Sequence, residues 1–198
     1  MTWVKVCGLT THEDVAVAVD AGADAIGFVN IETSPRYVPL ERAAALAQGV
    51  PIHTMLLTMD AEPGPTLEFL EGSGIDGVQP YGRLASDLAA AALARGYLVL
   101  NPQRAALGLD FSVIPGIPLL DTQSDRALGG TGRVFDWEIA KSLSGRFVMA
   151  GGLGPDNVAA AVATIAPWGV DASSRLERAP GHKDPGMVAA CIQKAKQT

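Results

Sequence analysis

The feature that most constrains the fold is an alternation of short apolar, β-branched runs with Ala-rich helical stretches along the 198 residues. Such alternation is typical of βαβ units, in which the strands run parallel and the helices cover them. Strands are expected at Trp3–Gly8, Ala25–Asn30, His53–Met59, Gly77–Tyr81, Tyr97–Asn101, Pro118–Thr122, Phe147–Gly151 and Val170–Ser173. Helices are expected at His12–Ala21, Leu40–Gln48, Thr66–Glu71, Leu84–Arg95, Trp137–Leu143, Pro155–Ile165 and Pro185–Lys196.

Eight strands of this kind predict a closed (β/α)8 barrel, the TIM-barrel fold, with an open doubly wound sheet as the alternative. The segment Arg104–Pro115 reads poorly as a helix, so we expect a short or irregular fifth crossover. No Pro-, Ser- or Gly-rich linker divides the chain, and residues 1–198 are therefore expected to form a single domain.

Composition narrows the classes of partner. A formal net charge of −6 argues against a nucleic-acid binder, which would need a basic face. There is no run of about 18 apolar residues and no signal-peptide pattern, so we expect a soluble cytoplasmic protein without a membrane partner. Cys7 and Cys191 cannot build a disulfide framework, and His12, His53 and His182 lack metal-ligand spacing. We expect a small-molecule substrate and no metal or organic cofactor. Nothing in the sequence specifies an oligomeric state.

In a parallel barrel the active site lies at the C-terminal ends of the strands, where two side chains are suggestive. Cys7 ends the first strand and shares its inward face with Lys5, because side chains alternate along a strand. A thiol can act as a base when a nearby cation stabilises the thiolate, although a buried structural cysteine is the alternative. For Lys5 we favour an internal ion pair, for instance with Asp171. Asp121 ends the sixth strand and is a candidate general acid, with a cap or turn residue as the alternative.

Small residues follow the last three strands, in the positions where barrels commonly bind phosphate. Glycine lets backbone N–H groups approach an anion closely. The candidate phosphate ligands are Gly130, Gly132, Gly151, Gly152, Ser173 and Ser174. Arg36 follows the second strand and could bind a carboxylate bidentately, with a solvated surface arginine as the alternative.

Taken together, these residues make the chain resemble the phosphoribosylanthranilate isomerase family of tryptophan biosynthesis. The matching segments span almost the whole chain in the family's order. They are Lys5–Thr10, Gly22–Asp24 through Gly27-Phe28, Ser34–Val38, Leu120–Thr122, Gly129–Gly132 with Phe135–Trp137, Ala150–Leu153 with Asn157-Val158, and Gly169–Asp171 with Ser173-Ser174. The family has the (β/α)8 fold, in agreement with the strand count.

The resemblance implies an Amadori rearrangement of N-(5′-phosphoribosyl)anthranilate to 1-(2-carboxyphenylamino)-1-deoxyribulose 5-phosphate. Asp121 would protonate the ribose ring oxygen and open the furanose to a Schiff base. Cys7, as the thiolate, would remove the C2′ proton, and the enolamine would tautomerise to the aminoketone. Arg36 would hold the anthranilate carboxylate, and Gln79 and Asp171 are the further substrate-binding candidates.

The chain departs from the family pattern at three places. Arg175 replaces a glycine after the serine pair, and it could clash, contact the phosphate, or point outward; we favour the last two outcomes. Strand four reads Gln79–Gly82 with Pro80 and Tyr81 in place of Leu and His, and proline there predicts a bulge. Asn30 replaces an apolar residue.

Two other functions stay open. A histidine-pathway or dual-substrate isomerase would typically end strand one in Asp and carry a second phosphate site in the opposite half, whereas strands two to four here lack matching glycine loops. A non-catalytic phosphate-ligand-binding barrel is the other alternative, and the presence of both Cys7 and Asp121 argues against it.

Overall fold

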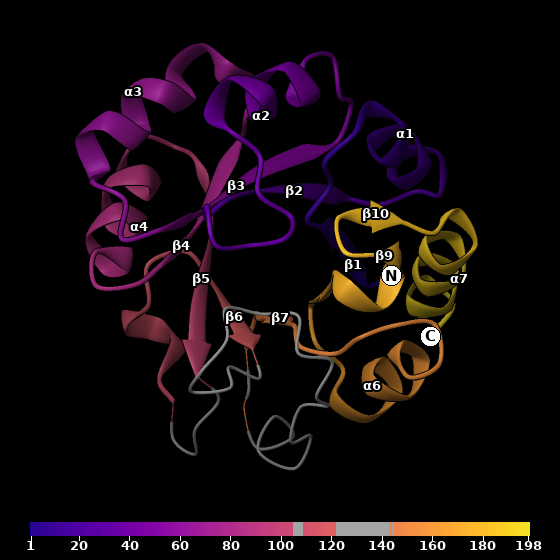
Figure 1. Cartoon of the computed structure of the whole chain (residues 1–198). Helices are drawn as coiled ribbons and strands as arrows, with labels where there is room; N and C mark the ends of the chain where they lie inside the picture. Colours follow the sequence, from indigo (N-terminus) through magenta and orange to yellow (C-terminus); the bar gives the residue numbers. More distant parts are fainter. Residues whose placement is uncertain (105–108, 122–142, 144) are drawn as a thin grey trace.

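The computed structural model describes residues 1–104, 109–121, 143 and 145–198. Within these residues, eight parallel strands form a closed barrel in sequence order, with the helices around it (Figure 1). The barrel closes where β1 pairs with β8, from Trp3 opposite Gly169 to Val6 opposite Ala172. This closure confirms the predicted (β/α)8 fold and excludes the open sheet.

Each strand falls on a predicted apolar run. The strands are β1 (Trp3–Cys7), β2 (Ala25–Asn30), β3 (His53–Met59), β4 (Gly77–Tyr81), β5 (Leu98–Arg104), β6 (Ile117–Asp121), β7 (Val148–Met149) and β8 (Gly169–Ala172). Most of their residues are buried, because helices cover the outside and side chains fill the inside. The runs are therefore mainly apolar, and this continuity made them recognisable.

The helices lie between the strands. They are α1 (His12–Asp20), α2 (Leu40–Ala47), α3 (Pro63–Ser73), α4 (Ala85–Ala94), α6 (Val158–Ile165) and α7 (Pro185–Lys196). In the described part of the fifth crossover there is only a 3₁₀ turn, η1 (Phe111–Val113), in line with the expected irregularity. The helix predicted at Trp137–Leu143 lies, except for its last residue, outside the described residues. Helix α3 starts earlier than predicted, since proline suits the first helical turn.

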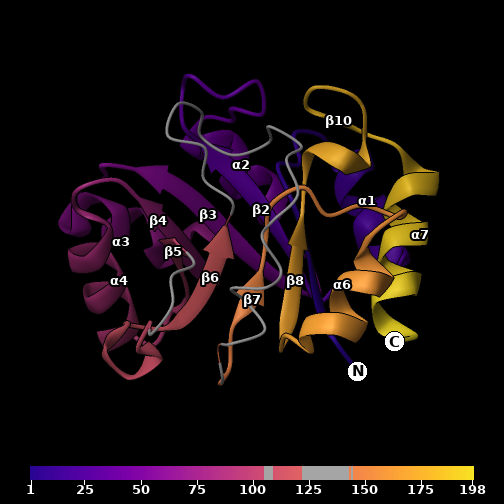
Figure 2. The same cartoon turned by 90° about the horizontal axis from the view of Figure 1, so that it is seen from below.

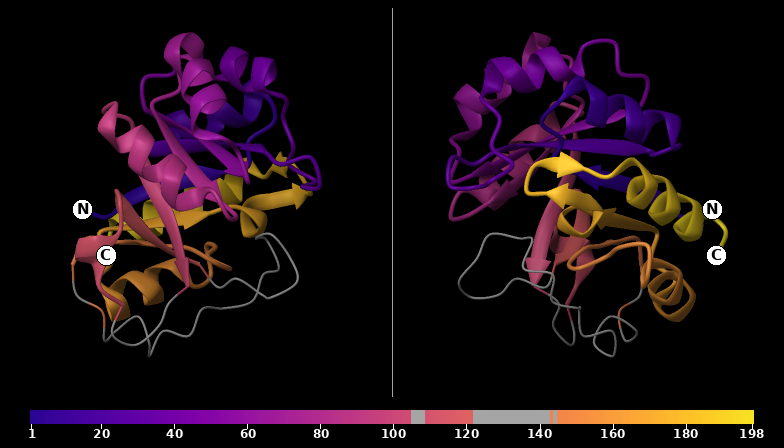
Figure 3. Two further views of the ribbon diagram at one scale, coloured as in Figure 1. Left: turned by 90° about the vertical axis from the view of Figure 1, so that its left-hand side faces the viewer. Right: turned by 45° about the vertical axis from the view of Figure 1, so that its right-hand side comes forward.

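The barrel interior is layered. An apolar layer of Met55, Leu100, Leu119, Val148 and Ala150 fills it below the site. The strands point toward the end of the barrel that also carries a short hairpin, and both termini lie near one another at the opposite end (Figures 2 and 3). The functional side chains predicted at the strand ends therefore stand on a closed, packed base.

The hairpin after β8 was not predicted. A 3₁₀ turn, η2 (Ser174–Leu176), leads into β9 (Glu177–Ala179) and β10 (His182–Lys183), which pair antiparallel. These strands are too short to give a hydrophobic period, and for this reason the sequence pattern did not reveal them.

The predicted bulge at Pro80 is wrong. Strand β4 keeps its register with β3 through Thr58 opposite Pro80 and Met59 opposite Tyr81. On its other edge, β4 pairs with β5 only as far as Val78. The proline lies beyond the last β4–β5 pair, so its missing N–H does not disturb that pairing. No helix within the described ranges is long and apolar enough to cross a membrane.

Candidate active site

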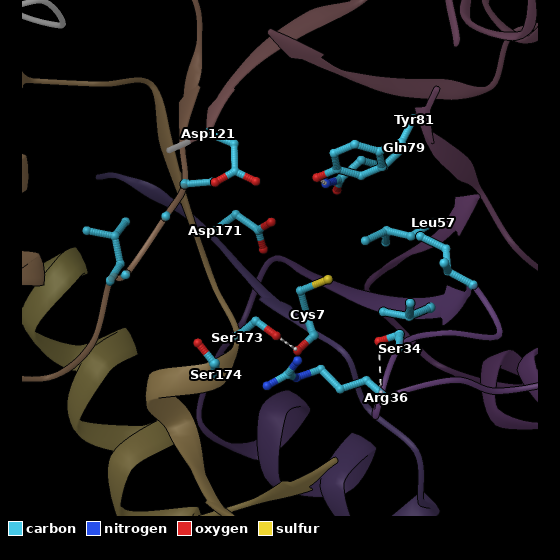
Figure 4. A pocket seen from close by; sticks show the side chains of 16 residues that line it. Cys7, Ser34, Arg36, Leu57, Gln79, Tyr81, Asp121, Asp171, Ser173 and Ser174 are labelled. Carbon is cyan, nitrogen blue, oxygen red and sulfur yellow. Dashed lines mark hydrogen bonds between the residues drawn. The ribbon is translucent and has the colours of Figure 1, made fainter. Parts of the chain in front are cut away.

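A pocket opens among the C-terminal ends of the strands, the end at which parallel barrels bind their ligands. It brings together most of the predicted site residues (Figure 4). These are Cys7, Arg36, Gln79, Asp121, Gly151, Gly152, Asp171, Ser173 and Ser174. Gly130 and Gly132 lie outside the described residues. The sequence did not single out the apolar part of the wall, formed by Val29, Ile31, Leu57 and Leu153.

The expected ion pair between Lys5 and Asp171 is confirmed. Lys5 Nζ donates to both carboxylate oxygens of Asp171 at 3.0 Å, and the Lys5 side chain is 0% exposed while that of Asp171 is 8% exposed. Pairing of β1 with β8 sets the two residues opposite one another. Gly27 makes room for this group, since a Cβ there would lie 3.0 Å from Cys7 Sγ and 3.1 Å from Lys5 Cε.

Cys7 is surrounded by charges of both signs. Burial has the largest effect and raises the pKa of the Cys7 thiol above its ordinary value, and Lys5 and Lys183 oppose this rise. For Lys5, burial lowers the pKa, but Asp171 and Cys7 outweigh burial and the pKa is raised. Lys5 therefore stays cationic beside the sulfur, and the resting sulfur is mainly a thiol at neutral pH.

Asp121 and Tyr81 line the pocket from β6 and β4, and Tyr81 packs against the apolar cluster that contains Cys7 (Figure 4). Burial raises the pKa of Tyr81 well above its ordinary value, and the negative charge of Asp121 adds to the rise, so the phenol stays protonated. Gln79 Nε2 donates to the Tyr81 hydroxyl at 2.7 Å. Among the described residues Gln79 Oε1 is buried without a hydrogen-bond partner, and it can accept a bond from a ligand.

Arg36 is held inside the protein and is not a solvated surface arginine. Its Nε and Nη2 donate to the two carboxylate oxygens of Glu177 at 2.7 Å each. Its backbone N–H donates to Ser34 Oγ at 3.1 Å, and Asn30 Nδ2 braces the same loop by donating to the Val38 carbonyl at 3.0 Å. Glu177 carries no local sequence signal for this contact, because no spacing pattern links two residues so far apart in the chain.

The side chain of Arg36 also needs a glycine beneath it. A Cβ on Gly8 would lie 2.5 Å from Arg36 Cδ, and Gly8 has a φ of +76°. Both facts require glycine at the end of the first strand. The Cys7-Gly8 motif thus supplies one side chain of the pocket, Cys7, and makes room for another, Arg36.

The loops after β7 and β8 form another wall of the pocket. Gly151 and Gly152 have positive φ angles of 93° and 65°, which glycine adopts readily. Ser173 Oγ donates to the Cys7 carbonyl at 2.9 Å, so its hydroxyl proton already has a partner in the protein. Ser174 lines the pocket.

Arg175 points away from the pocket lining, which is one of the outcomes favoured from sequence. Its Nη1 donates to the Gly152 carbonyl at 3.2 Å, and its Nη2 pairs with Asp156. The guanidinium thus ties the loop after β7 to the turn after β8. It does not clash with the glycine loop.

The described residues contain no group of three or more His, Cys, Asp or Glu side chains arranged for a metal ion. Cys191, the second free cysteine, is buried in α7, and burial raises its pKa to about 12. It is remote from the pocket lining and serves in packing.

A closed parallel barrel in which a thiol and a carboxylate face one pocket beside glycine loops is an enzyme architecture suited to acid–base chemistry. A family model described as N-(5′-phosphoribosyl)anthranilate (PRA) isomerase matches residues 4–194. The chain belongs to this family.

Individual relatives agree with the family match. The chain is 42% identical over 204 residues to an N-(5′-phosphoribosyl)anthranilate isomerase of Geobacter sp. (strain M21), covering 100% of this chain and 99% of the relative. It is similar in structure to phosphoribosyl anthranilate isomerase from Thermotoga maritima, with a TM-score of 0.87, 31% identity and full coverage of both chains. A further solved phosphoribosyl anthranilate isomerase, with a TM-score of 0.82, 29% identity and the same coverage, is in complex with reduced 1-(o-carboxyphenylamino)-1-deoxyribulose 5-phosphate.

Proposed function

We propose that this barrel isomerises N-(5′-phosphoribosyl)anthranilate to 1-(2-carboxyphenylamino)-1-deoxyribulose 5-phosphate, with Asp121 as general acid and Cys7 as general base. The observation that carries the assignment is that these two groups, from the ends of β1 and β6, line one pocket (Figure 4). An acid and a base on either side of a bound sugar are what ring opening and C2′ deprotonation require.

Asp121 acts in the first step. Its carboxyl proton passes to the ribose ring oxygen while the bond between C1′ and that oxygen breaks. The anthranilate nitrogen supplies the electron pair that forms the protonated Schiff base. Asp121 is left as the carboxylate, and the protonated hydroxyl of Tyr81 in the same pocket is able to donate a hydrogen bond to the sugar.

Cys7 acts in the second step. Its thiolate takes the proton from C2′, and the electrons of that bond form the C1′–C2′ double bond of the enolamine while the nitrogen regains its pair. Tautomerisation places a proton on C1′ and leaves a carbonyl at C2′. The Lys5 ammonium favours the thiolate, and Asp171 fixes Lys5 in place by its two hydrogen bonds.

The substrate carries an anion at each end, and the pocket has cationic or N–H-rich groups for both. Arg36 binds the anthranilate carboxylate. The backbone N–H groups of Gly151, Gly152 and Ser173 bind the phosphate together with Ser174, and Gly130 and Gly132 complete this set by the resemblance. Gln79 Oε1, which has no partner within the described chain, accepts a bond from a sugar hydroxyl. The net charge of −6 argues against a nucleic-acid partner.

The test is a fluorescence assay on purified protein, with phosphoribosylanthranilate generated in situ and its decay followed without added metal. We expect turnover at a rate that grows in proportion to protein concentration. Binding of the reduced product analogue without turnover would instead identify a non-catalytic phosphate-binding barrel. Turnover of the histidine-pathway substrate alone would show that the assigned substrate is wrong.

A further inference from the structure

Glu177 lies at the centre of a buried group of charges beside the pocket. It accepts two hydrogen bonds from Arg36 at 2.7 Å and one from Lys183 Nζ at 2.8 Å. The side chains of Arg36, Glu177 and Lys183 are 12%, 4% and 1% exposed. Lys183 Nζ also donates to the Ser173 carbonyl at 3.2 Å. Two cations therefore surround one anion, and the group has a surplus positive charge next to a pocket that is proposed to receive anions.

The hairpin that carries Glu177 and Lys183 is fixed to the loop after β1, to helix α1 and to the loop after β2. Thr10 Oγ1 donates to the Gly181 carbonyl at 2.7 Å, and the Lys183 backbone N–H donates to Asp14 Oδ1 at 3.2 Å. Gly181 lies so close to the second loop that a Cβ on it would come within 3.0 Å of the Pro35 carbonyl oxygen. Because of these contacts, the Glu177 carboxylate has a set position relative to Arg36.

The bidentate contact with Glu177 occupies one edge of the Arg36 guanidinium and does not occupy the other. Glu177 takes the Nε–H and one Nη2 hydrogen of Arg36. Among the described residues Nη1 has no acceptor, so Nη1 and the second Nη2 hydrogen form a fork that suits another carboxylate. Burial raises the pKa of Glu177, but the hydrogen bonds and charges of Arg36 and Lys183 outweigh burial and the pKa is lowered. Glu177 is therefore an anion throughout the neutral range.

We propose that Glu177, held in turn by Lys183, is a positioning residue that orients Arg36 so that the remaining fork faces the ligand carboxylate. This proposal rests on the proposed function for the identity of that carboxylate. The long, flexible side chain of Arg36 is thereby ordered before the ligand binds. Binding therefore does not carry the entropy cost of ordering it. Glu177 does not touch the reacting atoms, so its removal should act on substrate affinity and leave the chemical step largely intact.

The first test uses Glu177→Gln, with Glu71→Gln as the matched control. Glu71 also pairs with an arginine, Arg95, at 2.7 Å, but on the surface, where the two side chains are 59% and 48% exposed. We expect Glu177→Gln to raise KM about tenfold or more, the scale of a lost charged hydrogen bond, with kcat changed less than threefold. Glu71→Gln should leave both constants unchanged. A KM for Glu177→Gln within twofold of wild type, or an equal fall in kcat, would overturn the positioning role.

Ligand binding separates positioning of Arg36 from a general structural effect. The reduced product analogue and its counterpart without the ortho-carboxylate are titrated into each protein by calorimetry. Glu177→Gln should weaken the first ligand about tenfold and the second less than twofold. Equal weakening of both ligands would contradict the proposal. If Glu177→Gln does not fold, Glu177→Asp keeps the charge but shortens the reach, and the same selective loss is expected in smaller measure.

A measurement on the unliganded protein does not depend on the reaction. The Nε–H resonance of Arg36 in ¹⁵N-labelled protein, assigned by its loss in Arg36→Lys, should be protected from exchange in wild type and lose this protection in Glu177→Gln. If Arg36 loses its protection in Glu177→Gln but ligand affinity does not change, the ion pair exists and the positioning role is refuted. If Glu177→Gln gives both expected changes but wild type has no isomerase activity, only the proposed function is refuted.

Discussion

The buried pair of Lys5 and Asp171 allows a stability prediction whose size follows from the structure. Lys5→Met keeps most of the side-chain volume but leaves the Asp171 carboxylate, 8% exposed, without its two hydrogen bonds. Removing one partner of a buried pair typically costs about 3–5 kcal/mol. The loss of stability has an upper bound, because the unpaired Asp171 can take up a proton instead of staying charged. Keeping a carboxyl of ordinary pKa 3.8 neutral at pH 7 costs about 4 kcal/mol. We therefore expect a loss of about 3–4 kcal/mol at pH 7, or roughly 10 °C in Tm.

The same reasoning gives the pH dependence of that loss. In Lys5→Met the folded-state pKa of Asp171 lies further above its unfolded value, so the folded variant binds the extra proton. The loss must shrink as pH falls toward the unfolded pKa, to about 2 kcal/mol at pH 5. Urea unfolding at both pH values, followed by tryptophan fluorescence, measures the difference between variant and wild type. A second change, Asp171→Asn in the Lys5→Met background, should recover much of the loss. A loss below 1 kcal/mol, or one that does not change with pH, would refute this account of the pair.

The remaining predictions concern the site. Asp121→Asn should lower kcat by about 10²-fold or more, as measured in the steady state, because the ring oxygen loses its proton donor. Arg36→Ala should act mainly on KM, and an unchanged KM would place the carboxylate elsewhere. Since the Cys7 pKa is raised, kcat/KM should climb with pH through the range above 7, and a profile flat from pH 7 to 9 would argue against a thiolate base. Iodoacetamide at pH 9 should label Cys7 before Cys191, whose pKa is about 12, as peptide mass spectrometry can show.

Local patterns in the sequence predicted the barrel and part of the site. The strands are buried on both sides and therefore read as apolar runs, and their ends coincide with the residues that line the pocket. Alternation along β1 was enough to place Lys5 and Cys7 on the inward face and to suggest Asp171 as the partner of Lys5. These inferences succeeded because each depends on one strand or on the position of a strand end.

Features that depend on contacts between distant segments were missed. The Glu177 contact to Arg36 joins the hairpin after β8 to the loop after β2, and neither segment has a periodic pattern. The absence of a bulge at Pro80 follows from where the pairing of β4 with β5 ends, which is a property of the neighbouring strand. For Arg175 the sequence favoured either a phosphate contact or an outward direction, and the choice between them is set by Asp156 and the Gly152 carbonyl across a turn. None of these is encoded in a local spacing.

The central claim is that Cys7 is the base in the isomerisation of phosphoribosylanthranilate. The most direct test compares Cys7→Ala with Cys191→Ala in the fluorescence assay, since both residues are buried free cysteines and Cys7 alone lines the pocket. We predict that Cys7→Ala lowers kcat by about 10²-fold or more while the folded fraction, checked by circular dichroism, is unchanged. Cys191→Ala should turn over like wild type. Near-wild-type turnover by Cys7→Ala would contradict the account.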